Sequence, residues 1–233
     1  MQNIPVFVIV LFAFATFFTI FQFYIAAGKS GKLLVAMVVY MTVQSVLAID
    51  GFYKNGMSIP PRFMFLIGPG MLFGLSLCFF NSGKKFLDSL DLKALTLLHA
   101  VRLPVEIILY NVFVAGLIPE LMTFEGYNFD ILSGISAIVV YYLVFVRQKA
   151  GSKLLLIWNI ACLLLLINIV GIAILSAKTP FQQLAFDQPN IGVTYFPFVI
   201  LPAIIVPAVL VSHIAAIRQL LLKKAAQIPR QVH

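Results

Sequence analysis

The chain has 233 residues, of which 62% are hydrophobic and 10% charged, and its mean hydropathy is +1.05. Soluble domains are about 45–50% apolar and about 25% charged, so this composition excludes a water-soluble domain and predicts an integral membrane protein whose main partner is the lipid bilayer. The net charge of +8 does not indicate a nucleic-acid partner, because the basic residues flank apolar runs and form no basic face with interleaved aromatics.

Seven apolar runs follow one another along the chain. A spanning helix needs about 20 apolar residues, and an open sheet edge cannot exist in hydrocarbon. The sequence therefore predicts an all-α bundle that forms one transmembrane domain, 1–233. Its seven spans are expected at residues 4–27, 33–50, 62–81, 94–117, 130–147, 154–176 and 194–222. The first run is longer than a signal-peptide core and follows no positive charge, so we expect it to remain as a span.

Basic residues are distributed unequally between the loops. Twelve fall in the odd-numbered loops and the carboxyl-terminal tail: Lys29, Lys32, Lys84, Lys85, Lys93, Arg147, Lys149, Lys153, Arg218, Lys223, Lys224 and Arg230. Only Lys54, Arg62 and Lys178 fall on the other side. The positive-inside rule then predicts an amino terminus outside and a carboxyl terminus in the cytoplasm. We expect a multi-pass protein of the cell (inner) membrane.

Two pairs of segments suggest an internal repeat. Residues 29–34 and 149–155 share a lysine-flanked small-residue pattern, while residues 63–69 and 196–202 share a Phe-x-Phe start and a final proline. Both similarities align spans one to three with spans five to seven in the same membrane orientation. Some transporters are built from parallel repeats of this kind. Chance similarity between apolar segments is the alternative.

The repeat divides the chain into two triplets with a helix between them. The first triplet covers 1–81, the linker helix 94–117 and the second triplet 130–222. This 3+1+3 layout resembles the SWEET sugar transporters and their bacterial relatives, which would imply a transport function. That family carries proline–glutamine signatures early in each triplet, whereas here Pro69 and Pro202 stand in the third helix, so no sugar-binding residue can be transferred.

The fourth span carries most of the ionisable residues within the apolar runs. They are His99, Arg102, Glu106 and Tyr110, which fall on one stripe about 80° wide at helical spacing. Such a stripe has to face other helices or water. Arg102 and Glu106 are four residues apart and are expected to pair directly, either to fix this helix in place or as half of a substrate or proton site.

Asn159 and His213 stand at a depth similar to that of His99, counted from the cytoplasmic ends of their helices. If the fourth, sixth and seventh spans are neighbours, these residues line one polar pocket with Arg102. Helix-to-helix hydrogen bonding without a ligand is the alternative for both histidines.

Two outer loops mix acids, amides and aromatic residues. Their candidate gate residues are Glu120, Glu125, Asp130, Gln182 and Asp187. Ordered interfacial turns with aromatic anchors are the alternative interpretation of these loops.

Three functions remain open from the sequence. The leading hypothesis is a small-molecule transporter or ligand-binding channel with its polar site between the triplets. The second is a membrane-embedded enzyme, or a metal or haem protein, that uses His99 and His213. The third is a sensor or a structural subunit of a membrane complex. No cofactor or metal ligand set can be assigned, and an oligomer is compatible with the sequence.

Overall fold

The computed structural model of the chain describes residues 4–226, with side chains up to residue 223. Within this part the chain forms helices and no β-strand, which confirms the predicted all-α class. The α-helices described are α1 (Val6–Ala26), α2 (Gly31–Ile49), α3 (Phe63–Ser76), α4 (Asn81–Ser89), α5 (Leu92–Leu98), α6 (Arg102–Val114), α7 (Asp130–Tyr141), α8 (Ser152–Leu175) and α9 (Val206–Ala226). Arg230 and the side chain of Lys224, both counted in the charge asymmetry, lie outside the described part.

Several helices are extended or joined by short irregular turns. Single 3₁₀ turns stand at Phe52–Lys54, His99–Val101, Glu120–Met122 and Gly192–Thr194, and π-helical turns at Tyr142–Val146 and Leu201–Ile205. The turn at His99–Val101 joins α5 and α6 into one continuous helix, Leu92–Val114, and the turn at Leu201–Ile205 leads directly into α9.

Five helices are long and apolar enough to cross a membrane. They are Val6–Ala26, Gly31–Ile49, Leu92–Val114, Ser152–Leu175 and Leu201–Lys223. A sixth is present if α3 and α4, which meet at an angle of 89°, count as one span. The predicted span at 130–147 forms a shorter apolar helix, Asp130–Val146. A helical bundle is therefore established, with two of the seven predicted spans shorter or more bent than expected.

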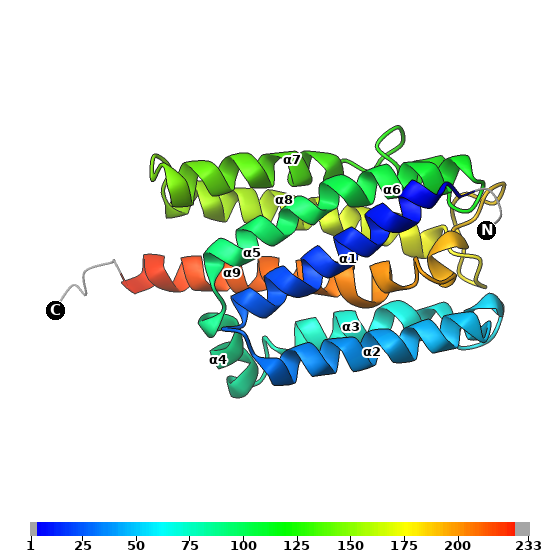
Figure 1. Cartoon of the computed structure of the whole chain (residues 1–233), viewed down its shortest axis with the longest axis horizontal. Coiled ribbons are helices and arrows are strands. Elements are labelled where there is room, and N and C mark those ends of the chain that lie inside the picture. Colours follow the sequence, from blue (N-terminus) through cyan, green and yellow to red (C-terminus); the bar gives the residue numbers. More distant parts are fainter. Residues whose placement is uncertain (1–3, 227–233) are drawn as a thin grey trace.

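The helices run back and forth along the long axis of the bundle, so α1 begins and α9 ends at opposite ends of it (Figure 1). Helix α9 lies at the centre and packs against α3, α5 and α8, and α1 crosses α5 and α6. Helix α2 stands at the edge, where little of its surface is buried inside the protein. The core therefore forms around α9, and Ser212 and His213 of α9 are buried in it together with Arg102 and Glu106 of α6.

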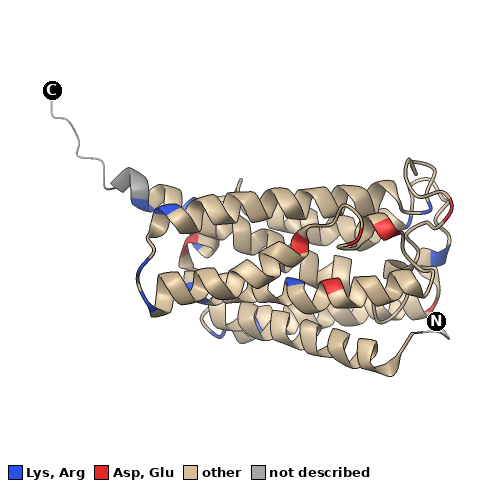
Figure 2. Ribbon diagram, turned by 90° about the horizontal axis from the view of Figure 1, so that it is seen from above, with Lys and Arg blue, Asp and Glu red and all other residues tan. Residues whose placement is uncertain are grey.

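The outer surface of the bundle is strongly apolar. Large side chains such as Phe14 and Phe17 on α1 and Val35 and Val39 on α2 are more than half exposed. Lysine and arginine gather at the end of the bundle where α9 ends (Figure 2). Such an apolar belt would be unstable in water and is the surface expected of helices that face lipid.

Helix α4 lies across this basic end of the bundle. Arg218 of α9 donates two hydrogen bonds to Asp88 of α4, at 2.8 Å and 2.9 Å. The helix starts against the backbone of Leu77, where a Cβ on Gly83 would lie only 2.5 Å from the Leu77 carbonyl oxygen. The bend between α3 and α4 therefore depends on the absence of a side chain at Gly83.

Candidate functional site

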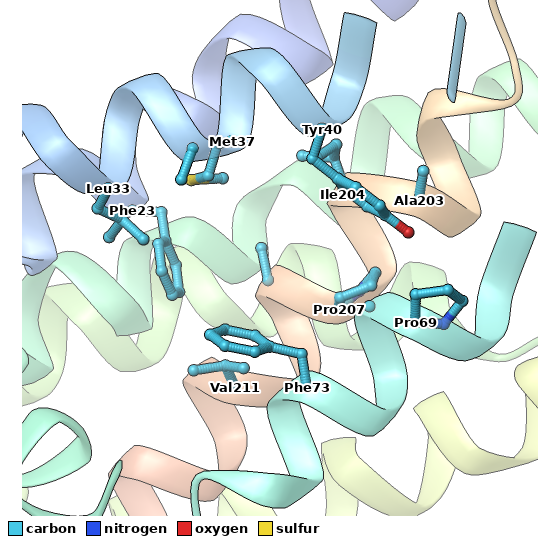
Figure 3. Close-up of a pocket in the computed structure, with 13 residues that line it drawn as sticks. Phe23, Leu33, Met37, Tyr40, Pro69, Phe73, Ala203, Ile204, Pro207 and Val211 are labelled. Carbon is cyan, nitrogen blue, oxygen red and sulfur yellow. The ribbon is translucent and has the colours of Figure 1, made fainter. Parts of the chain in front are cut away.

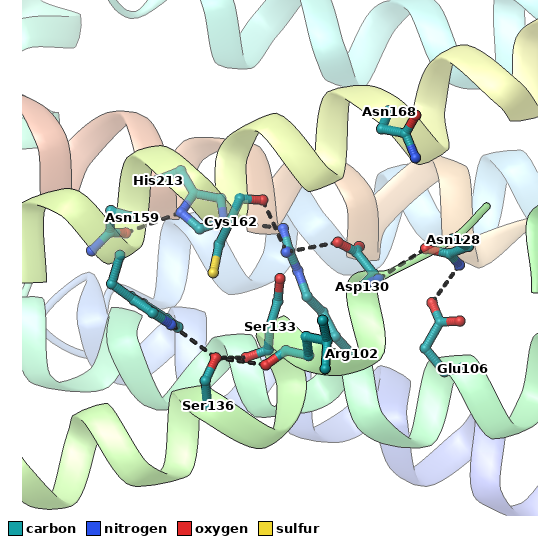
Figure 4. A network of polar contacts seen from close by, with 12 residues as sticks. Arg102, Glu106, Asn128, Asp130, Ser133, Ser136, Asn159, Cys162, Asn168 and His213 are labelled. Carbon is teal, nitrogen blue, oxygen red and sulfur yellow. Dashed lines mark hydrogen bonds and ion pairs between the residues drawn. The ribbon is translucent and has the colours of Figure 1, made fainter. Parts of the chain in front are cut away.

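Helices α6, α7, α8 and α9 and the loop before α7 bring polar side chains together inside the bundle (Figure 4). Each of these side chains is at most 5% exposed. We call them the Arg102 network: Arg102, Glu106, Asn128, Asp130, Asn159 and His213. Five of the six, all except Asn128, are candidate residues predicted from the sequence, and the structure brings those five into one cluster.

Arg102 is the centre of this network. Its Nη1 donates to Asp130 Oδ1 at 3.0 Å and to the carbonyl oxygen of Cys162 at 3.1 Å. Its Nη2 lies 3.0 Å from His213 Nε2. The expected direct pairing of Arg102 with Glu106 is therefore wrong, because the guanidinium pairs with a carboxylate of the neighbouring helix.

A close approach of α6 and α7 explains this choice of partner. A Cβ on Gly134 of α7 would lie 2.5 Å from the backbone nitrogen of Leu103, so only glycine allows the two backbones to pack at this distance. The contact brings the first turn of α7, and with it Asp130, against the start of α6. Asp130, expected in the gate of an outer loop, consequently belongs to the core.

The hydrogen bonds of His213 define its tautomer. Nε2 faces an arginine N–H and must accept, while Nδ1 lies 3.0 Å from Asn159 Oδ1 and must donate. The Asn159 amide is oriented by its own Nδ2, which donates to the Leu155 carbonyl at 2.8 Å. His213 is therefore a neutral imidazole with its proton on Nδ1.

His99 lies beside the network without joining it. Its ring stacks on that of His213, with centroids 3.9 Å apart and planes inclined by 19°, and Trp158 packs edge-on at 5.4 Å. Histidines that ligate one metal direct a ring nitrogen at it from about 2.0–2.1 Å. Here the rings present their faces to each other, and both nitrogens of His213 are occupied, so the geometry does not support a shared metal or haem iron.

Glu106 occupies the other end of the network. Its Oε1 accepts from Asn128 Nδ2 at 2.6 Å, and Asn128 Oδ1 accepts from the backbone N–H of Asp130 at 3.1 Å. Glu106 Oε2 is buried and has no hydrogen-bond partner among the described residues. An ionisable oxygen that is buried and unpaired is costly, so this atom requires an explanation.

A small cavity adjoins Glu106. It has a volume of about 70 Å³, and Glu106 and Asp130 are the ionisable residues that line it. Its other walls are apolar and come from α3, α6, α8, the 3₁₀ turns Glu120–Met122 and Gly192–Thr194, and the π-helical turn with the start of α9. Because a water molecule needs about 10–15 Å³, the cavity has room for small ligands and not for an organic solute.

A much larger pocket lies among the loops at the opposite end of the bundle from the lysine-rich end. It measures about 570 Å³ and we call it the loop pocket; its polar lining residues are Glu120, Glu125, Tyr127, Asp187 and Gln188. Tyr127 is 63% exposed, whereas its neighbour Asn128 is completely buried in the Arg102 network. The segment 127–128 therefore connects the loop pocket to the buried network.

Two candidate residues lie apart from both sites. Tyr110 is half-buried and stacks on Phe124, with ring centroids 5.0 Å apart. Gln182 donates to the carbonyl oxygens of Leu184 and Ala185 and so stabilises its own loop. The five predicted gate residues therefore do not form one site. Three of them line the loop pocket: Glu120, Glu125 and Asp187. Asp130 is buried in the Arg102 network, and Gln182 stabilises only its own loop.

Asn128 was missed by the sequence analysis as a site residue. It stands two residues before Asp130, and its side chain bonds that residue's backbone N–H, a local pattern typical of Asn and Asp. The signal in the sequence that could have identified Asn128 is its position two residues before Asp130, at the start of an apolar run.

An apolar groove opens between α2, α3 and α9 (Figure 3). It measures about 340 Å³ and is lined by apolar side chains such as Phe23, Met37, Phe73 and Val211, with the Tyr40 hydroxyl as a polar exception. A groove with so few polar groups cannot orient a polar solute, so the Arg102 network is the stronger functional candidate.

Comparison with known proteins identifies a family and no function. Residues 63–221 match the family described as "Domain of unknown function (DUF8737)", and the chain belongs to this family. No curated protein and no solved structure is similar to the chain. The matched region contains the whole Arg102 network.

Proposed function

We propose that the chain is an integral membrane protein of the cell membrane with seven spans, its amino terminus outside and its carboxyl terminus in the cytoplasm. The apolar surface supports lipid contact, and the lysines at one end of the bundle support this orientation. Asp130–Val146 has 17 residues, about 25 Å at 1.5 Å per residue. That length is at the lower limit of about 17–25 residues for a span.

The 3+1+3 parallel repeat is part of this proposal. Its support is the alternating direction of the helices and the two echoed sequence pairs (Figure 1). The two echoed prolines have different environments, because Pro69 lies inside the α-helix α3 and Pro202 inside a π-helical turn. Any repeat has therefore diverged at the third helix of each triplet.

We further propose that the protein transports a small solute and that the Arg102 network is the gate of the pathway, here closed. The observation that carries this proposal is the unbroken chain of contacts from Glu106 through Asn128, Asp130 and Arg102 to His213. A gate in this sense consists of groups that can exchange their internal partners for a ligand.

Two features favour a gate over a fixed structural cluster. Arg102 Nε is buried without a partner among the described residues, so the guanidinium retains unused donor capacity. The network also continues into the segment that lines the loop pocket, through Asn128 and Tyr127. A solute in the loop pocket could therefore act on the network by moving this segment.

The test is solute flux into liposomes that contain the purified protein. Glycerol, glucose and potassium acetate serve as probes, and light scattering reports vesicle swelling. We expect faster swelling than in protein-free liposomes for at least one probe, and loss of that flux in Arg102→Met. Flux should be normal in Thr42→Ala, because the Thr42 hydroxyl is exposed and bonds only the Val38 carbonyl of its own helix. Wild-type rates equal to those of protein-free vesicles for every probe, with the protein shown to be folded, would contradict the proposal.

The second candidate is a sensor or structural subunit, in which the network only holds helices together. The small volume beside the network, about 70 Å³, favours it, because no organic solute fits there without rearrangement. In that case the flux assay gives no signal, and the loop pocket is a surface for a partner protein.

A further inference from the structure

We infer that the cavity beside Glu106 binds one monovalent cation, either a proton or a sodium ion. The inference deepens the proposed transport function by naming a coupling ion, and its role in transport rests on that proposal. Ion binding itself is measured without transport, so the two can fail separately.

The first argument is the charge of the network. Arg102 contributes one positive charge, and Asp130 and Glu106 together contribute two negative charges when both are ionised. His213 is neutral because its Nε2 accepts from arginine. His99 has no anion in contact with either ring nitrogen, so it gains nothing from a charge in this interior. With both carboxylates ionised the cluster would have a net charge of −1.

The elements packed around Glu106 provide no further compensation. Helix α8 contributes the amide of Asn159 and the carbonyl oxygen of Cys162, the loop contributes Asn128, and α3 contributes apolar walls. An uncompensated charge in an apolar interior is strongly unfavourable. One added positive charge makes the cluster neutral, whereas a divalent ion would leave it positive.

The second argument is the free oxygen. Glu106 is 2% exposed, its Oε1 is taken by Asn128, and its Oε2 has no partner among the described residues. Glu106 also lines the cavity. A bound proton on this carboxyl, or a sodium ion beside it, would satisfy the free oxygen, and water in the remaining space would complete the contacts.

The third argument is the size and wall of the cavity. A volume of about 70 Å³ is far below the volume of about 300–1,000 Å³ of pockets for drug-sized ligands, so the cavity suits a proton or a small inorganic ion with water. The π-helical turn Leu201–Ile205 contributes Leu201 and Pro202 to the wall. Single π-helical turns inside α-helices are frequent at functional sites, and proline removes an N–H from the helix ladder.

The experiment is thermal unfolding of the full-length protein in detergent. One series varies the pH between roughly pH 5 and pH 8 without sodium, and the other varies NaCl at about pH 8 with choline chloride as the balancing salt. A ligand that binds only the folded state raises the midpoint with its concentration. The variants are Glu106→Gln, which keeps the shape and removes the charge, and Glu125→Gln as the exposed control.

If the ligand is a proton, the midpoint of wild type rises relative to that of Glu106→Gln as the pH falls, and it does not respond to sodium. The buried neutral histidines His99 and His213 take up protons on unfolding and lower the midpoints of both proteins alike, so the difference between the two proteins is the measured response. If it is sodium, the midpoint rises with NaCl and not with choline. In both cases Glu125→Gln behaves as wild type and Glu106→Gln loses the response. The inference is overturned if the midpoints of wild type and Glu106→Gln respond alike to pH and alike to NaCl.

Glu106→Asp covers the case in which Glu106→Gln does not fold. The shorter side chain moves the carboxylate within the cavity, so its response should need a higher ion concentration than wild type. An unchanged midpoint concentration overturns the inference. Ion-dependent stability without solute flux in any vesicle assay would support the ion site and contradict transport.

Discussion

Replacing Arg102 tests the central physical claim about the network. Arg102→Met keeps a long, flexible apolar side chain in the same space and removes the guanidinium. The change leaves Asp130 Oδ1 without its counter-charge and withdraws the donors from His213 Nε2 and the Cys162 carbonyl. Three buried acceptors therefore lose their partner at once.

The buried carboxylate dominates the expected magnitude. Removing one partner of a buried ion pair costs about 3–5 kcal/mol. Ordinary hydrogen bonds between membrane helices average only about 0.6 kcal/mol, so the two neutral acceptors add little. We expect Arg102→Met to lower the free energy of unfolding by about 3–5 kcal/mol, with most of the loss due to Asp130.

The assay is reversible unfolding in mixed detergent micelles, with Asn168→Ala as the matched control. Asn168 donates one hydrogen bond, to the Tyr127 carbonyl at 2.7 Å, and is exposed, so its loss should cost about 0.6 kcal/mol. The double variant Arg102→Met/Asp130→Asn removes both charges and should recover much of the stability. Equal losses in Arg102→Met and Asn168→Ala, or no recovery in the double variant, would refute the reasoning.

Two further predictions concern packing and a buried hydroxyl. Gly134→Ala should destabilise the protein by about 1–3 kcal/mol through overpacking, because the new Cβ would meet Leu103. Gly171→Ala in α8 should stabilise it, because a Cβ there has no neighbour within 4 Å. The thermal unfolding midpoints of the two variants check this. Burial raises the pKa of Tyr53 to about 12, and its hydroxyl donates to Gln44 Oε1. Tyr53→Phe should therefore cost about 1–3 kcal/mol by leaving that oxygen unpaired, and a Tyr53→Phe/Gln44→Leu double variant should cost less than the sum of its parts.

The helices and the buried face of α6 could be predicted from the sequence because both depend on local periodicity. His99, Arg102 and Glu106 recur at helical spacing within an apolar run, and each of them is at most 3% exposed. Burial follows from this pattern alone, since ionisable groups on one stripe cannot face lipid.

The partners of those residues could not be predicted in the same way. Arg102 pairs with Asp130 and not with Glu106, because Gly134 lets the backbones of α6 and α7 pack closely. This contact depends on how the two helices cross. The bend of α3 into α4 similarly depends on Gly83 packing against Leu77. The sequence around a single glycine does not indicate which other helix will pack against it.

The Arg102→Met/Asp130→Asn variant also separates the two candidate functions. If the network only holds helices together, a variant that recovers stability should recover every activity of the protein, because its remaining groups pack as before. If the network is a gate, the stabilised variant still lacks the guanidinium that exchanges partners, and solute flux stays lost while the free energy of unfolding returns. Stability and flux measured on the same preparation therefore distinguish a packing device from a transport site.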